Sequence, residues 1–103
     1  MSVYIIVQLK IHDREQYNLY QAGFWNVFKQ YQGKLLSSDE NVRVVEGEWP
    51  LDKLVLIEFP SEKAFYDWSM SPEYLHIAKN RIAGANATII MSHQFSLTDP
   101  VGF

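Results

Sequence analysis

The sequence has no cysteine among its 103 residues. This absence excludes disulfide bonds, a catalytic thiolate, iron–sulfur clusters and cysteine-bound zinc, and it fits a reducing compartment. Long apolar runs are also missing, since none approaches the roughly 20 residues that a membrane-spanning helix needs. Residues 2–11 alternate in character and end in charged residues, rather than forming the apolar block of a signal peptide. We therefore expect a cytoplasmic protein that has no membrane partner.

Basic residues are few, and the motifs of several enzyme classes are absent. The nine lysines and arginines do not cluster, which argues against nucleic acid as a partner. The five glycines are scattered and form no phosphate-binding loop, and no Gly-x-Ser-x-Gly motif is present. The three histidines share no ligand spacing, and residues 73–76 hold a single Glu-x-x-His where a di-iron site requires two. We therefore expect neither a metal nor a cofactor.

What the sequence does contain is enough apolar material for one small folded domain. Hydrophobic residues make up 48% of the chain and aromatic residues 15%, which is too apolar for a disordered segment. A chain of this length forms one modest core. We assign residues 1–95 to a single domain and residues 96–103 to a C-terminal tail.

The spacing of apolar residues predicts an α+β domain. Strands are expected near residues 3–11, 42–49, 53–59 and 87–95, and helices near residues 13–31 and 61–83, the second broken around residues 69–71. Residues 34–49 are expected to hold one strand or two short ones, interrupted by the polar residues 37–41. The order β-α-β-β-α-β is the ferredoxin-like arrangement, which has an antiparallel sheet.

Capping residues place the ends of these helices. Asp13, Ser61 and Ser71 stand where a side-chain oxygen accepts from an unpaired backbone N–H of the first turn. Gly33 is expected to end the first helix in the left-handed conformation that favours glycine, and Gly84 to end the last.

Apolar residues occupy both faces of the predicted strands. The helices of such a domain cover one face of the sheet, so the other face of a monomer should be polar. In the first strand, however, Ile5 lies on one face while Tyr4 and Ile6 lie on the other. A second copy, related by a two-fold axis, is the simplest cover for this exposed apolar face. We therefore expect a homodimer, with Val101 and Phe103 of the tail crossing onto the partner.

One stretch of the chain carries motifs of a known family. Residues 46–49 read Glu-Gly-Glu-Trp, a hydrophobic strand closes in Glu-Phe-Pro-Ser at residues 58–61, Trp68 lies late in the next helix, and residues 71–74 read Ser-Pro-Glu-Tyr. Together these resemble the domain-of-unknown-function family numbered 1330, which belongs to the dimeric α/β-barrel group. The resemblance implies a ferredoxin-like fold and a dimer joined through its sheets. It implies no activity, because the family has none assigned.

Ionisable residues on otherwise apolar elements mark a candidate site. Glu46 and Glu58 lie at or near strand ends, Arg81 lies at the edge of the buried stripe of the last helix, and His93 lies in the last strand. We expect an aromatic pocket between the first helix and the sheet, with a polar end built from Arg81 and one of the other three. The structural alternatives are an Arg–Glu pair that ties helix to sheet and a histidine bonded to backbone. The candidate pocket residues are Tyr17, Tyr20, Glu46, Glu58, Arg81 and His93.

Two functions fit these expectations. The first is a dimeric α/β-barrel protein of uncharacterised role that binds a small organic metabolite in the pocket. The second is a cofactor-independent small-molecule enzyme, of the monooxygenase or isomerase kind found in the wider superfamily, with a glutamate or histidine as base and Arg81 stabilising an anion. Haem binding, a third possibility in that superfamily, would rest on His76, which we place on the solvent side of its helix. Convergence of ionisable groups in one pocket distinguishes the first two.

Overall fold

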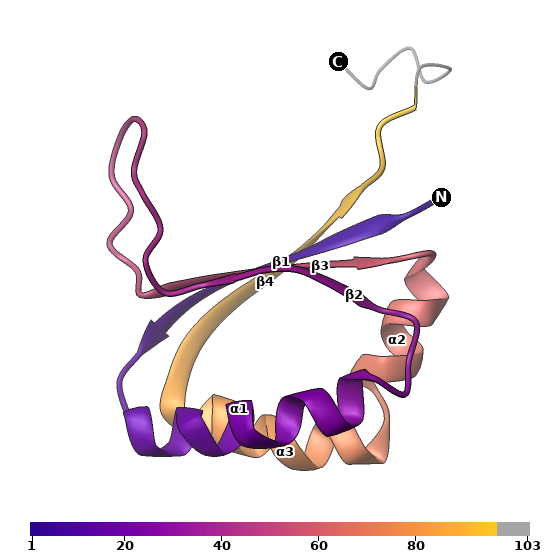
Figure 1. The fold of residues 1–103 in the computed structure, drawn as a ribbon, viewed down its shortest axis with the longest axis horizontal. Helices are drawn as coiled ribbons and strands as arrows, with labels where there is room; N and C mark the ends of the chain where they lie inside the picture. Colours follow the sequence, from indigo (N-terminus) through magenta and orange to yellow (C-terminus); the bar gives the residue numbers. More distant parts are fainter. Residues whose placement is uncertain (97–103) are drawn as a thin grey trace.

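A computed structural model describes residues 1–96 of the chain. The elements, in chain order, are β1 (Val3–Ile11), α1 (Arg14–Phe28), β2 (Lys34–Asp39), β3 (Lys53–Phe59), α2 (Glu62–Ser69), α3 (Pro72–Gly84) and β4 (Ala85–His93). The strands form one antiparallel sheet in the order β2-β3-β1-β4, and the helices lie on one face of it (Figure 1). This confirms the α+β, ferredoxin-like architecture. No helix among the described residues is long and apolar enough to cross a membrane.

Each helix begins at its predicted capping residue. The side chains of Asp13, Ser61 and Ser71 each accept the backbone N–H three residues further along the chain. The Ser71 hydroxyl also donates to the Trp68 carbonyl at 2.7 Å, so this one side chain closes α2 and opens α3. Pro72 follows at the first helical position, where an N–H would have no helical partner. The predicted break in the second helix is therefore a change of helix.

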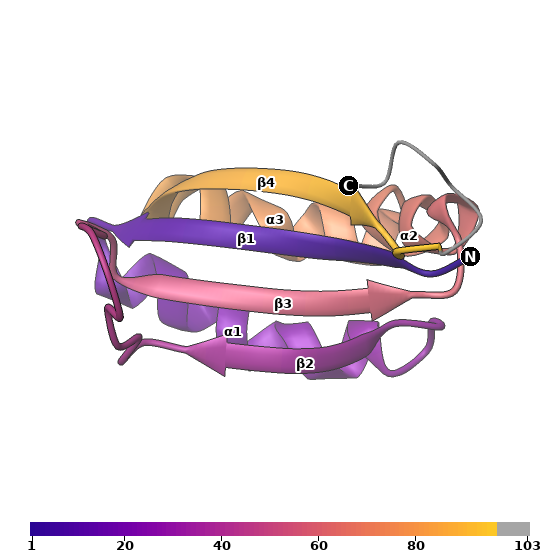
Figure 2. The same ribbon diagram turned by 90° about the horizontal axis from the view of Figure 1, so that it is seen from above.

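β1 is a central strand, and its alternation separates the two faces of the sheet. Val3, Ile5, Val7 and Leu9 are buried beneath the helices. Ile5 lies opposite Ile57 of β3 and Met91 of β4, so all three strands share one helix-facing set. The residues between them face the opposite side, which Figure 2 shows as a sheet surface with no helix over it.

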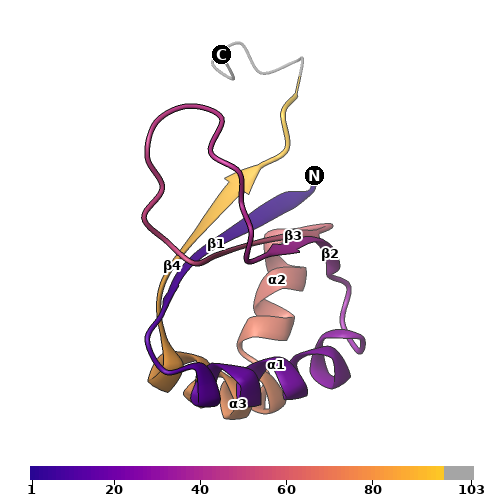
Figure 3. The same ribbon diagram turned by 60° about the vertical axis from the view of Figure 1, so that its left-hand side comes forward.

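The second strand occupies only the first part of residues 34–49, the range in which one strand or two short ones were expected. The prediction placed a strand at residues 42–49, but residues 34–39 pair with β3 and residues 42–49 form no strand. β2 is an edge strand, so the polar residues 37–39 are tolerated there because much of their surface stays in water. Residues 40–52 instead form a loop that rises from the sheet on the side away from the helices (Figures 1 and 3). Val45, in the middle of this loop, is 95% exposed.

Gly84 joins the end of α3 to the start of α1. Its carbonyl accepts the N–H groups of His12 and Asp13, both at 3.0 Å. A Cβ at this position would lie 2.6 Å from the backbone nitrogen of Tyr17 and 2.9 Å from the carbonyl oxygen of Asp13. Glycine is therefore required by the close approach of the two helices. β4 starts directly after it, two residues earlier than predicted.

A cluster of rings fills the opposite end of the space between helices and sheet. Phe28 of α1 lies with its ring centroid 6.1 Å from Phe59 of β3 and 5.4 Å from Trp68 of α2. Phe59 and Trp68 stack at 5.6 Å. Each of these side chains is at most 4% exposed. These buried ring contacts connect α1, β3 and α2.

Gly33 serves this cluster and does not have the predicted left-handed conformation. Among the described residues the glycine with positive φ is Gly47, at 88°. α1 has already ended at Phe28, and a Cβ at Gly33 would lie 2.5 Å from the Phe28 ring and 2.8 Å from the Phe59 ring. The physical reason for glycine at this position is therefore ring packing.

We predict that Gly33→Ala lowers the free energy of unfolding by about 2 kcal/mol, because a methyl group forced into a packed core displaces two rings that have no space to move. Chemical denaturation measures the loss. Gly47→Ala is the control, since no atom lies within 4 Å of its added Cβ and its cost is limited to backbone strain. A Gly33→Ala protein within about 0.5 kcal/mol of the parent would contradict this account of the ring cluster.

Candidate functional site

A cavity of about 480 Å³ lies between the helix-facing side of the sheet and the three helices. Its walls come from all four strands and from α1, α2 and α3, and most of them are apolar. Seven aromatic side chains line it: Tyr17, Tyr20, Phe24, Phe65, Tyr66, Trp68 and Tyr74. The cavity lies between α1 and the sheet, the position at which the sequence predicts an aromatic pocket.

Four rings form a continuous wall along the helix side of this cavity. Neighbouring ring centroids are 5.7 Å apart for Tyr17 and Tyr20, 6.2 Å for Tyr20 and Tyr74, and 4.2 Å for Tyr74 and Trp68. These separations are within the range of favourable aromatic contacts. The wall gives a largely apolar surface of rings tilted or edge-on to one another, which runs from α1 to the end of α2.

The side chains of Tyr17 and Tyr20 on this wall are buried, and their hydroxyls remain protonated at neutral pH. Tyr20 and Tyr74 share a hydrogen bond of 3.0 Å between their hydroxyl oxygens. Burial raises the pKa of Tyr17 to about 12, partly offset by the positive charge of Arg81. Burial, with help from the neighbouring Tyr74, raises the pKa of Tyr20 well above its usual value. These hydroxyls therefore serve as hydrogen-bonding groups, and they are poor bases.

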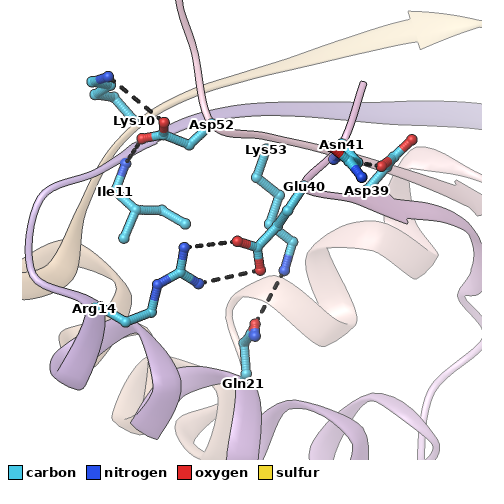
Figure 4. Close-up of polar contacts among 9 residues, drawn as sticks. All are labelled: Lys10, Ile11, Arg14, Gln21, Asp39, Glu40, Asn41, Asp52 and Lys53. Atoms are coloured by element: carbon cyan, nitrogen blue, oxygen red, sulfur yellow. Dashed lines mark hydrogen bonds and ion pairs between the residues drawn. The ribbon is translucent and has the colours of Figure 1, made fainter. Parts of the chain in front are cut away.

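Lys53 forms the polar end of the cavity on the sheet side. It is the first residue of β3, points towards α1, and is 5% exposed (Figure 4). Its Nζ donates to Gln21 Oε1 at 3.3 Å and lies 4.9 Å from the centre of the Tyr17 ring. Burial lowers the pKa of Lys53, and the nearby Glu40 acts in the opposite direction. The cavity thus contains an ammonium group that has left bulk water.

Two ion contacts hold the ends of the loop formed by residues 40–52 near this lysine. Arg14 of α1 binds Glu40 through both terminal nitrogens, at 2.7 and 3.2 Å (Figure 4). The same contact lowers the pKa of Glu40. At the other end, Asp52 accepts the backbone N–H of Ile11 at 2.7 Å and lies 3.6 Å from Lys10. Both ends of the loop are therefore attached to the body of the domain.

Three of the six predicted site residues line the cavity. Tyr17 and Tyr20 form its wall as expected, and Arg81 of α3 contributes to its lining. The Arg81 Nε is buried and has no hydrogen-bond partner among the described residues. Neither the predicted Arg81 contact with a glutamate or histidine nor the alternative Arg–Glu pair between helix and sheet is formed within this part of the chain.

Glu46, Glu58 and His93 lie outside the cavity, for reasons of strand parity and loop position. Glu46 is exposed on the loop that was predicted to be a strand. Glu58 alternates with the buried Ile57 and Phe59, so it faces the other side of the sheet. His93 does face the helices, as its parity with Met91 predicted, but it lies at the strand end and contacts Glu62 of α2 at 2.7 Å.

Sequence reasoning missed Lys53 and its partner Gln21. The signal was available, because Lys53 alternates in register with Val55, Ile57 and Phe59 and so belongs to the helix-facing set. A lysine at a strand start is usually assigned to solvent, since its long side chain can reach water. Here it points inward, and the side chain is enclosed between the strand and α1.

The sequence matches, over residues 2–94, the model of a family described as a domain of unknown function, DUF1330. The chain belongs to this family. The resemblance predicted from residues 46–74 is thereby confirmed. No curated protein matches the sequence.

Solved structures similar to this DUF1330 protein share its fold at low sequence identity. A protein of unknown function from Rhodopseudomonas palustris has a TM-score of 0.78 at 18% identity, covering 92% of this chain and 83% of that one. A dimeric ferredoxin-like protein of unknown function from Jannaschia has a TM-score of 0.73 at 8% identity, covering 91% of this chain and 100% of that one. SnoaB, a cofactor-independent oxygenase from Streptomyces nogalater, has a TM-score of 0.63 at 15% identity, covering 95% of this chain and 98% of that one. At these identities the likeness shows the fold alone.

The pKa of Lys53 gives a stability prediction. Because its folded-state pKa lies below 10.5, the folded protein releases this proton at a lower pH than the unfolded chain. We predict that Lys53→Met is at least as stable as the parent at pH 7, since no charge is then buried. The parent should regain stability relative to the variant as pH rises towards 10.5.

Urea denaturation at intervals from pH 7 to pH 10.5 measures this difference. Lys63→Met is the matched control, because Lys63 is exposed and contacts Asp67 within its own helix. Its difference from the parent should stay flat over the same range. A Lys53→Met difference that is also flat would show that burial does not perturb the lysine.

Proposed function

We propose that this DUF1330 protein binds a small organic molecule in the cavity between its sheet and its helices. The observation that carries the proposal is an aromatic cavity lined by two residues that each hold a buried hydrogen-bond donor without an acceptor. Trp68 Nε1 and Arg81 Nε are both buried and lack a partner among the described residues, and both residues line the cavity. Buried polar groups are nearly always bonded in proteins, so unpaired donors around a cavity favour an occupant that accepts from them.

The size and lining of the cavity support the same proposal. Its volume of about 480 Å³ lies within the usual range for small-molecule sites. Such sites are mostly apolar with a few polar groups that orient the ligand. Here the tyrosine wall supplies the apolar surface, and Lys53 and Arg81 supply the polar groups.

The enzymatic alternative has less support from the geometry. It requires a glutamate or histidine base in the pocket, and the described residues that line the cavity include no aspartate, glutamate or histidine. The titratable groups there are tyrosines, Lys53 and Arg81, and burial raises the pKa values of Tyr17 and Tyr20. Binding of a metabolite is therefore the function we favour over a cofactor-independent reaction with a Glu or His base.

We also propose that the protein is a homodimer joined through the face of the sheet opposite the helices. The centre of this face is apolar, with Tyr4 and Ile6 of β1 beside Leu54 and Leu56 of β3 and Ile90 of β4. Ile90 is 50% exposed in the single chain. Two solved structures of the same fold are of dimeric proteins, which supports this arrangement. The expected contacts of Val101 and Phe103 lie outside the described residues.

For the cavity, we predict saturable binding of a neutral planar probe, 2-naphthamide, measured by calorimetry. The indole N–H resonance of Trp68 should shift on binding, because the Trp68 side chain lines the cavity, while that of the exposed Trp25 should not. Ala78→Phe should weaken binding at least tenfold by filling the cavity. Ala83→Phe, on the exposed side of the same helix, is the control and should bind as the parent does.

Two outcomes would contradict the cavity proposal. One is the absence of measurable binding to the folded parent protein. The other is binding that Ala78→Phe leaves unchanged while its circular dichroism shows a native fold. Native mass spectrometry of freshly purified protein adds a direct search for a co-purified molecule.

For the assembly, we predict a dimer at micromolar concentration, with an interface of about 800 Å² per partner. Ile90→Lys should shift sedimentation to the monomer, because it places a charge at the centre of the apolar face. Leu19→Lys is the matched control, since Leu19 is 53% exposed on α1, on the helix side of the sheet. A parent protein that sediments as a monomer at this concentration would refute the arrangement.

A further inference from the structure

Lys53 is a buried cation that has no carboxylate of its own. The side chain is 5% exposed, and among the described residues the one hydrogen-bond acceptor of its Nζ is the neutral Gln21 Oε1, at 3.3 Å. An ammonium group carries three donors, so the others have no acceptor in this part of the chain. The Tyr17 ring, 4.9 Å away, gives a weaker cation–π contact. The cavity therefore faces a positive charge with unused donors.

The carboxylate whose charge acts on Lys53 is already occupied. Glu40 is bound by both terminal nitrogens of Arg14, at 2.7 and 3.2 Å. This two-point geometry is the strongest that a carboxylate makes with a single side chain. Glu40 also does not line the cavity. Its charge lowers the positive electrostatic potential at Lys53, but it does not occupy the cavity, where a second anion can still bind.

Other residues that line the cavity also have hydrogen-bond donors without acceptors. Arg81 brings a second positive charge with a buried, unpaired Nε, and Trp68 brings an unpaired Nε1. The hydroxyls of Tyr20 and Tyr74 are bonded to each other. No carboxylate lines the cavity among residues 1–96. Leaving a buried donor unbonded costs more than a hydrogen bond normally gains, so the cavity favours an occupant rich in acceptors.

We infer that the cavity selects organic acids, with the ligand carboxylate accepting from Lys53 Nζ beside Gln21 and its apolar body lying along the tyrosine wall towards Trp68. This inference rests on the proposed function. The proposed function names only a small organic molecule, whereas this inference specifies a negatively charged ligand, its orientation in the cavity, and Lys53 as the residue that determines both. Lys53 begins β3 and Phe59 ends it, so the two lie about 20 Å apart at the rise of an extended strand. Because Trp68 stacks on Phe59, the indole and the ammonium mark opposite ends of the space.

The test compares two probes of equal shape, 2-naphthoate and its neutral amide, by calorimetry at pH 7. The parent protein should bind the acid roughly ten- to a hundredfold more tightly than the amide, as expected for a charge-assisted hydrogen bond in a buried site. Lys53→Met should reduce this preference to about one, because it removes the group that distinguishes the acid from the amide. Lys63→Met, which removes an exposed lysine, should keep the parent preference.

A second variant tests the same charge without removing it. Gln21→Glu places a carboxylate where Oε1 now accepts from Lys53, in a side chain of the same size. The internal ion pair should then compete with the ligand, so that the preference for the acid falls at least fivefold while the amide still binds. This variant decides the question if Lys53→Met does not fold.

The outcomes separate this inference from the proposed function. A parent protein that binds both probes equally overturns the inference and leaves the cavity as a site without a preference for charge. A Lys53→Met protein that keeps the preference for the acid overturns the inference by showing that Lys53 is not its source. Failure of both probes to bind the folded parent overturns the proposed function itself. A preference that is lost in both variants and kept in Lys63→Met supports the assignment of Lys53.

Discussion

The separation between the helix layer and the sheet depends on the packing of Phe28, Phe59 and Trp68. These rings come from α1, β3 and α2, and their edge-to-face and stacked contacts hold the layers apart at one end of the domain. At the other end, the carbonyl of Gly84 binds the start of α1 and brings the two long helices together. The space between these two fixed ends is not filled by side chains. The cavity is therefore a consequence of how the layers are supported, rather than of any single missing residue.

The side chains around the cavity do not maximise the stability of the isolated protein. A buried lysine opposite a neutral amide, and buried N–H groups without acceptors, each cost free energy in the isolated protein. Aliphatic residues at the same positions would give a more stable core. Local conflicts of this kind tend to occur at functional sites, where the cost is offset when a partner binds. The site is thus recognisable from the polar groups that the core leaves unbonded.

Sequence reasoning succeeded where the determinants are local. The caps at Asp13, Ser61 and Ser71 act within one helical turn, so they could be predicted without knowing the tertiary contacts. The position of β2 depends on pairing with β3, and an edge strand tolerates the polar residues that suggested an interruption. The inward direction of Lys53 follows from register, whereas its enclosure follows from α1. Predicting that enclosure required the distance between strand and helix, which no local pattern contains.

The attachment of the loop of residues 40–52 links two parts of the molecule. Its first residue, Glu40, lies in the electric field of Lys53, while the loop itself rises from the sheet on the side of the proposed partner. If the proposed partner contacts the loop and shifts the Arg14–Glu40 pair, the potential at the lysine changes with it. Thermodynamic linkage would make that effect reciprocal, so that an anion bound at Lys53 would change the affinity of the two subunits by the same factor. Subunit association and ligand binding would then be thermodynamically coupled, so that a change in one shifts the other.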